Sequence, residues 1–340
     1  MSDLRTEVSE PASAPTPGGD GGRRWQPTTQ QLNEGGLAAA LLVLVLVLSF
    51  SAPHFASVDN MWAILGDAAL VGIVAWAATL VIVAGEIDLS VGPAVAFWSV
   101  ILAELNGPWG IPLGPAMVLT LVGGALVGGL AGWLRARFGV PSFIVTLGLW
   151  SGLRGLAQFM TNALPVPIED NAFLDLLGGK VGQVPTAGII MIVLFVAFAF
   201  VAQRTTYGRS VFAVGGNARA AMLSGIDVAR VRVVLFATSG LMAALLGIVF
   251  AGRLASGNSG AAVGLEFSVI AAVVVGGTSL SGGRGSLLGT LLGVLFITVI
   301  GNGLVILGVN SYVQDVVRGG LIVVAVLVNM LLQRRTGDTD

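Results

Sequence analysis

The sequence predicts an all-α polytopic membrane protein with about ten transmembrane helices, and three observations lead to this fold class. The 340-residue chain is 55% hydrophobic with a mean hydropathy of +0.91, and only 10% of its residues are charged, against roughly 25% in a soluble domain. A bilayer core requires about 20 apolar residues per helix. Apolar runs close to this length follow one another along the chain. The period-two alternation of a lipid-exposed barrel does not occur.

The elements follow in order from these runs. Residues 1–36 are rich in Pro, Gly, Ser and Thr and are predicted to be a disordered cytoplasmic tail. Residues 37–333 form one transmembrane domain, and residues 334–340 a cytoplasmic C-terminal tail. The predicted spans are 37–52, 62–84, 91–105, 113–134, 142–160, 187–202, 233–254, 267–281, 286–306 and 313–332.

Basic residues set the predicted orientation. With the amino terminus inside, most arginines fall in cytoplasmic segments, whereas the outer loops hold only Lys180 and Arg253. This asymmetry follows the positive-inside rule, and an even number of spans places both termini in the cytoplasm.

Two acidic residues stand between apolar runs in residues 85–92 (GEIDLSVG). An ionised acid in the hydrocarbon core is costly, and a helix break there must be buried in protein or line a cavity. Glu86 and Asp88 therefore either cap helix ends and pair with Arg154 or Arg318, or line a route for a polar solute. Residues 275–283 (VGGTSLSGG) form a second Gly-interrupted segment, and paired breaks in two halves of a transporter indicate a central pathway.

Polar residues within or beside the spans are the candidates for this pathway. Asn302 and Gln314 are uncharged hydrogen-bonding groups, for which bonding between helices is an equally good explanation. The candidate pathway or helix-break residues are Glu86, Asp88, Ser90, Thr278, Ser279, Ser281, Asn302 and Gln314.

The long inner loop, residues 203–232, contains a short predicted helix. Asn217 is a good N-cap and Gly225 a good C-terminal stop, leaving a helix of about 10 Å over residues 218–224. So short a helix is marginal in water and must pack against something, either its own bundle or a cytoplasmic partner. The candidate docking residues are Asn217, Ala218, Arg219, Ala220, Ala221, Met222, Leu223, Ser224 and Gly225.

Several kinds of chemistry are excluded by composition. A GxxxxGK[ST] phosphate loop requires a lysine, and the only lysine, Lys180, precedes a valine. With no cysteine and one histidine, His54, a metal site is not expected, and catalytic motifs such as HExxH and GxSxG do not occur. We expect no enzyme activity and no cofactor in this chain. There are two alternatives to an ATP-driven transporter. One is an ion-coupled secondary transporter with Glu86 and Asp88 as coupling acids, and the other is a membrane scaffold.

Five ordered motifs resemble the membrane permease subunits of bacterial ABC importers for ribose, xylose and related monosaccharides. They are GEIDLSVG, VPSFIVTLG with RGLA, TTYGRSVFAVGGNARAAMLSGI, VIAAVVVGGTSLSGGRGSLLGTLLG and NGLVILGV, spread between residues 37 and 333. Met222 departs from the pattern, because many members have a basic residue there.

This resemblance implies a ten-helix subunit of the vitamin B12 import type in the bacterial plasma membrane. It implies a second permease subunit, in a homodimer or with a close relative, two cytoplasmic ATPase subunits that bind ATP-Mg, and an external sugar-binding protein. Residues 217–225 would then be the coupling helix that inserts into the ATPase. The binding protein would dock chiefly on outer loops 161–186 and 255–266, and the cargo would be a monosaccharide. No nucleic-acid partner is implied.

Overall fold

The structure is a computed structural model and describes residues 29–168 and 172–335. Helices account for most of this part of the chain. They are α1 (Thr29–Ser51), α2 (Val58–Val83), α3 (Val91–Asn106), α4 (Leu113–Phe138), α5 (Ser142–Thr161), α6 (Ala172–Gly178), α7 (Thr186–Arg204), α8 (Thr206–Leu223), α9 (Val228–Leu254), α10 (Leu265–Val275), α11 (Leu287–Ile306) and α12 (Ser311–Arg335).

Each predicted span coincides with one helix, namely α1 to α5, α7 and α9 to α12. Within the described residues, seven helices are long and apolar enough to cross a membrane: α1, α2, α4, α5, α7, α9 and α11. Helices α3 and α10 are apolar but shorter. The prediction of a polytopic helical membrane protein is therefore confirmed.

Some predicted boundaries differ from the structure. Helix α1 begins at Thr29, so residues 29–36 of the predicted tail are helical. Residues 334 and 335 likewise belong to α12, while the rest of the two predicted tails, 1–28 and 336–340, lies outside the described residues. Helix α10 ends at Val275 rather than near residue 281, because its apolar run gives way to Gly276 and Gly277, and Gly277 has a positive φ of 87°.

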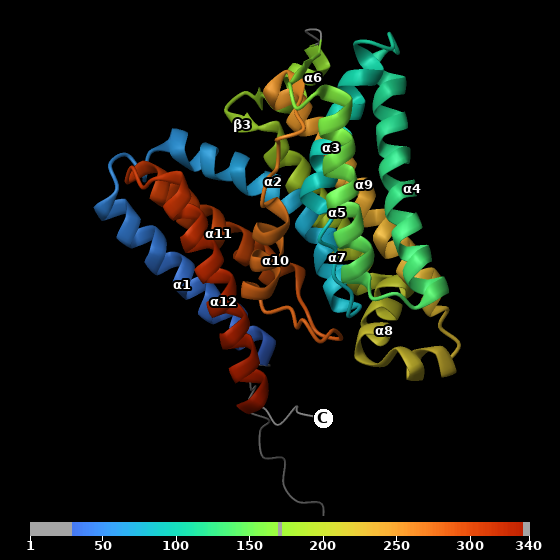
Figure 1. The fold of residues 1–340 in the computed structure, drawn as a ribbon. Helices are drawn as coiled ribbons and strands as arrows, with labels where there is room; N and C mark the ends of the chain where they lie inside the picture. Colours follow the sequence, from blue (N-terminus) through green and yellow to red (C-terminus); the bar gives the residue numbers. More distant parts are fainter. Residues whose placement is uncertain (1–28, 169–171, 336–340) are drawn as a thin grey trace, which may run out of the picture.

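The helices form two groups joined by α2. Helix α1 lies beside α11, with α12 and α10 close by, whereas α4 packs along α9, with α3 and α5 next to them (Figure 1). In the most apolar 18-residue stretch of α2, 83% of the residues are buried, against 6% in the corresponding stretch of α1. The main core accordingly gathers around Trp76, Ile73 and Val83 of α2, with Phe236 and Leu246 from α9.

Glycines allow a close crossing between α4 and α9. A Cβ on Gly128 would overlap the carbonyl oxygen of Phe236, and one on Gly240 would overlap that of Gly124. Small residues let helix backbones approach in this way where lipid provides no hydrophobic driving force. The glycines of α5 differ, because a Cβ on Gly148 or Gly152 would meet nothing within 4 Å. One side of α5 is therefore open.

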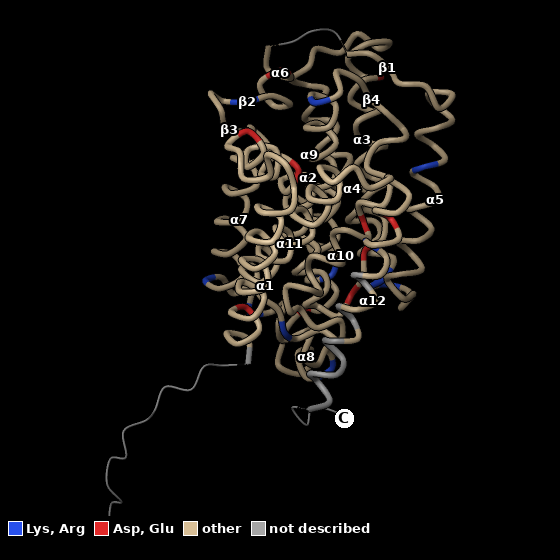
Figure 2. Tube along the Cα trace, turned by 90° about the vertical axis from the view of Figure 1, so that its left-hand side faces the viewer, with Lys and Arg blue, Asp and Glu red and all other residues tan. Residues whose placement is uncertain are grey.

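Short strands occur at the end of the body opposite α8 (Figures 1 and 2). Strand β1 (Val166–Pro167) pairs antiparallel with β4 (Ser256–Gly257), and β2 (Lys180–Val181) pairs with β3 (Val184–Pro185). Between them α6 forms from the Leu-rich part of loop 161–186. Most of the body carries no charge in Figure 2, and blue positions gather around α8.

Candidate functional site

The two predicted helix breaks lie against each other, close to α8. The N–H of Gly283 donates to the carbonyl oxygen of Val83 at 2.8 Å, which joins the end of α2 to the loop after α10. A Cβ on Gly282 would come within 3.0 Å of the backbone of Gly85. Both glycines have a positive φ, 77° at Gly85 and 86° at Gly282, a conformation that suits glycine because it has no Cβ.

Helix α8 completes this junction. A Cβ on Gly215 would overlap the carbonyl oxygen of Val83 and come within 2.6 Å of the amide nitrogen of Gly283. We call Gly85, Gly215, Gly282 and Gly283 the glycine junction. It brings three segments into backbone contact although they are far apart in the sequence, so a displacement of α8 would act directly on both helix breaks.

Glu86 anchors the first break. Its side chain is only 2% exposed, and its carboxylate lies 2.9 Å from Nε of Arg135 and 2.6 Å from Nε of Arg232. The Arg135 contact is an aligned hydrogen bond, whereas the Arg232 N–H does not point along a hydrogen-bond direction, so that contact is an ion pair. The prediction that Glu86 pairs with Arg154 or Arg318 is wrong, because α4 ends and α9 begins next to the break and each supplies an arginine.

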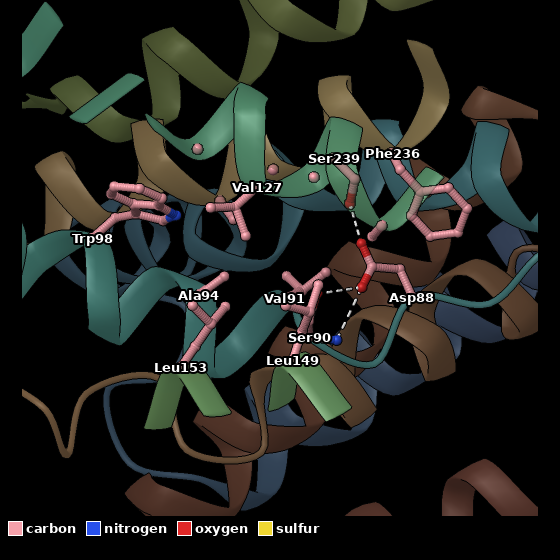
Figure 3. A pocket seen from close by; sticks show the side chains of 15 residues that line it. Asp88, Ser90, Val91, Ala94, Trp98, Val127, Leu149, Leu153, Phe236 and Ser239 are labelled. Atoms are coloured by element: carbon pink, nitrogen blue, oxygen red, sulfur yellow. Dashed lines mark hydrogen bonds between the residues drawn. The ribbon is translucent and has the colours of Figure 1, made fainter. Parts of the chain in front are cut away.

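Asp88 organises the start of α3. One carboxylate oxygen accepts from the backbone N–H of Ser90 at 2.9 Å and from its hydroxyl at 2.6 Å, and the other accepts from the Ser239 hydroxyl at 2.7 Å (Figure 3). The cavity beside it has a volume of about 10 Å³, the room that one water molecule needs. Asp88 therefore ties the start of α3, through Ser90, to Ser239 of α9, and does not face a wide passage.

The second break is also packed. Thr278 and Ser279 are buried, and the Ser279 N–H donates to the carbonyl oxygen of Arg284 at 3.0 Å to close the loop, whereas Ser281 is exposed. Of the candidate pathway residues, Glu86, Asp88, Ser90, Thr278, Ser279 and Ser281 thus belong to the two packed breaks. The structure separates them from Asn302 and Gln314.

Asn302 and Gln314 line a larger cavity of about 260 Å³ between α2, α10, α11 and α12. Asn302 exchanges two hydrogen bonds, of 2.9 and 3.0 Å, with Asn60, and Gln314 donates to the carbonyl oxygen of Val309 at 2.8 Å. Further polar lining comes from Asp67, Ser268, Thr298 and Arg318. An uncharged polar solute would find both donors and acceptors here.

Two charged residues of this cavity have partners on its rim. Arg318 lies 3.3 Å from Asp315, and Asp67 accepts from Arg253 at 2.9 Å. Arg154 lies instead over the ring of Trp150, with its guanidinium carbon 5.7 Å from the ring centroid.

The predicted short helix occurs as the second half of α8. Asn217 breaks the helix with extended backbone angles, and its side chain accepts from the N–H of Ala220 at 2.9 Å, as an N-cap does. Gly225 follows the helix with a φ of 87°. Met222 and Leu223 are 58% and 80% exposed, whereas Ala221 is buried against the core. This segment presents two adjacent exposed apolar side chains, Met222 and Leu223, while its Ala221 packs on the core.

The sequence did not predict the first half of α8. Thr205 accepts from the N–H of Gly208 at 3.1 Å as an N-cap, and Val211 and Val214 are buried, a spacing that would have indicated a helix. Burial also raises the pKa of the Tyr207 phenol above its ordinary value, so its hydroxyl stays protonated and donates to the carbonyl oxygen of Val231.

A buried acid, Glu266, was also missed. It lies in the first turn of α10, at the edge of the predicted outer loop 255–266. Part of that loop packs into the body, because Gly257 lies against the carbonyl oxygen of Ser99 in α3 and the carbonyl oxygen of Ala262 packs against Gly92. A lone acid within an apolar run, the signal that pointed to Glu86, was present here too.

Residues 60–326 match the family described as "Branched-chain amino acid transport system / permease component". The chain belongs to this permease family. The permease is 60% identical over 325 residues to the probable ABC transporter permease protein YphD of Escherichia coli (strain K12), covering 96% of this chain and 98% of the relative. It is therefore a transport subunit of the inner membrane rather than an enzyme.

Two other relatives have names that give their cargo. The L-arabinose ABC transporter permease protein AraH of Azospirillum brasilense is 36% identical over 96% of the permease and 95% of its own length. The ribose import permease protein RbsC of Escherichia coli (strain K12) is 39% identical, over 91% of the permease and 97% of its own length. No solved structure matches the chain.

Proposed function

We propose that the permease imports a monosaccharide as the membrane subunit of an ATP-driven importer. The observation that carries this is the exposed, capped segment of residues 217–225 in a chain whose sequence has no phosphate-binding loop. Such a chain needs a separate motor, and the segment offers an apolar tip for it. The names of AraH and RbsC support a pentose as cargo, although the description of the family refers to amino acids.

The proposed subunit has ten membrane crossings, made by α1 to α5, α7 and α9 to α12, in an arrangement of the vitamin B12 import type. Both termini are cytoplasmic in this arrangement, as is α8, which carries Arg209 and Arg219. Two partner ATPase subunits bind ATP-Mg, and an external sugar-binding protein delivers the cargo. Part of loop 161–186, including α6, would receive that protein, while residues 169–171 lie outside the described residues.

A second copy of the permease would cover the open side of α5. Gly148, Gly152 and Gly155 leave space on this helix, and Arg154 stands within it. A charged group in a span needs protein or water around it rather than lipid. A homodimer would surround Arg154 with protein and would place the sugar route between the two copies. The cavity at Asn302 and Gln314 would then lie beside this route.

Transmission from the motor would pass through the glycine junction. ATP-driven closure of the ATPases moves the tip at Met222 and Leu223, and Gly215 in the same helix pushes on the backbone of Val83 and Gly283. The two helix breaks then shift together, which changes the route between outward-open and inward-open states.

Uptake by the reconstituted transporter tests the cargo. Vesicles holding the permease, its ATPase and its binding protein are supplied with labelled D-ribose, L-arabinose or L-leucine. We expect ATP-dependent uptake of at least one sugar and none of leucine. Accumulation of leucine without either sugar would contradict the proposal and would favour the amino-acid description of the family.

A further inference from the structure

Helix α10 starts inside the body rather than at its end. After β4 the chain runs without regular structure before α10 begins, as Figure 1 shows in orange, and Ala262 of this segment packs against Gly92 of α3. The 11 residues of α10 span only about 16 Å at 1.5 Å per residue, roughly half of a bilayer core. Irregular backbone at such depth is tolerated only where it is buried in protein or lines a cavity, and half-helices of this kind hold solutes in transporters.

Glu266, in the first turn of α10, has half of its carboxylate unused. The residue is 2% exposed, and its Oε1 accepts from the indole N–H of Trp150 at 2.9 Å. Its Oε2 is buried and has no hydrogen-bond partner in the described part of the chain. Buried charged oxygens are normally satisfied, because leaving one without a donor is costly. Oε2 lies directly against Gly92 of α3, since a Cβ at that position would overlap the oxygen.

The groups around Glu266 have the chemistry that a polyol requires. Trp150 is half-buried and belongs to α5, next to the open positions Gly148 and Gly152. Arg154 adds donor groups on the same helix, and Arg318 Nη1 lies 3.7 Å from where a Cβ of Gly264 would stand. A carboxylate accepts from hydroxyl groups, guanidinium groups donate to them, and an aromatic ring covers the C–H face of a sugar ring.

We infer that Glu266 and Trp150 form a transit site for the sugar at the start of α10. Sugar hydroxyls donate to Oε2 and replace the Trp150 N–H at Oε1, while the freed indole ring packs on the sugar. In the structure described here, the hydrogen bond between Glu266 and Trp150 closes the site between α5 and α10. This inference rests on the proposed function, since it assumes that the cargo is a sugar.

The site is tested in the reconstituted transporter by measuring sugar uptake and ATP hydrolysis side by side. The sugar is D-ribose or L-arabinose, whichever the wild type imports. E266Q and W150A should lower uptake by about tenfold or more, the loss expected when a hydrogen bond to a charged group disappears. ATP hydrolysis stimulated by the loaded binding protein should stay within about twofold, because Glu266 is buried and neither residue belongs to α6 or to the tip of α8, where docking and coupling are proposed. W150F keeps the ring and should lose less uptake than W150A.

E104Q and W109F are matched controls outside the site and should transport at the wild-type rate. Import by the wild type together with unchanged uptake by E266Q and W150A would overturn the transit site alone. Absence of sugar import by the wild type would instead overturn the proposed function.

Labelling gives a second readout that does not depend on these variants. The chain has no cysteine, so V263C introduces a single thiol. Val263 directly follows Ala262, which packs against Gly92, and it is exposed in the structure. Saturating sugar should slow its reaction with a small water-soluble thiol reagent during turnover. Reaction at the same rate with and without sugar, or no reaction in any state, would overturn the inference.

Discussion

Replacing Glu86 with glutamine is expected to lower the free energy of unfolding of the permease by about 3 kcal/mol. The change removes the one carboxylate that neutralises Arg135 and Arg232, and it leaves both guanidinium groups at the inner helix ends without their acid. Removing one member of a buried ion pair typically costs 3–5 kcal/mol. The low end applies because the two arginine side chains are 22% and 19% exposed and remain within reach of water.

Unfolding in mixed detergent micelles measures this effect, and the chain offers its own control. The ion pair of Asp67 and Arg253 has the same 2.9 Å separation as that of Glu86 and Arg135, but both its side chains are nearly half exposed. D67N should therefore cost less than about 1 kcal/mol. Adding R135Q and R232Q to E86Q should recover much of the loss, because no unpaired charge then remains. Equal stability of E86Q and D67N would contradict this account of the break.

L223D is expected to weaken binding of the ATPase by at least about 30-fold and to abolish uptake. Leu223 is the most exposed apolar side chain of the coupling segment, and a residue at the centre of an interface commonly contributes 2 kcal/mol or more, which corresponds to about 30-fold. Aspartate at this position would also place an uncompensated charge in the contact. M222D should act in the same direction.

Co-purification of the ATPase with each variant measures this loss. L164D is the matched control, because Leu164 is similarly exposed but follows α5, far along the chain from α8. It should retain the ATPase. Ala221 is unsuitable for this purpose, since it is buried and an aspartate there would disturb packing rather than docking. Full binding of the ATPase by L223D would show that the tip of α8 is not the docking point.

Local patterns in the sequence predicted the helices and the two breaks well. Gly85 and the two acids after it mark the end of α2 and the start of α3, and Asn217 and Gly225 mark the ends of the short helix in the second half of α8, because each acts through its own backbone neighbours. The apolar runs placed every membrane helix for a similar reason.

Contacts over long distances in the sequence were beyond these patterns. Glu86 meets Arg135 and Arg232 because α4 ends and α9 begins beside the first break, and nothing near Glu86 in the sequence indicates which arginines approach it. The bond between Trp150 and Glu266 joins residues 116 positions apart. The glycine junction likewise depends on how α8 folds back under α2.

Solute accumulation by the purified permease in vesicles, with and without its ATPase, tests the central claim that this chain opens a passage but does not drive transport. We predict accumulation only when the ATPase, the binding protein and ATP on the ATPase side of the membrane are all present. The permease alone should accumulate no solute under a proton or sodium gradient. Accumulation against a gradient by the permease alone, driven by either ion, would contradict the claim and would make Glu86 and Asp88 candidates for coupling acids.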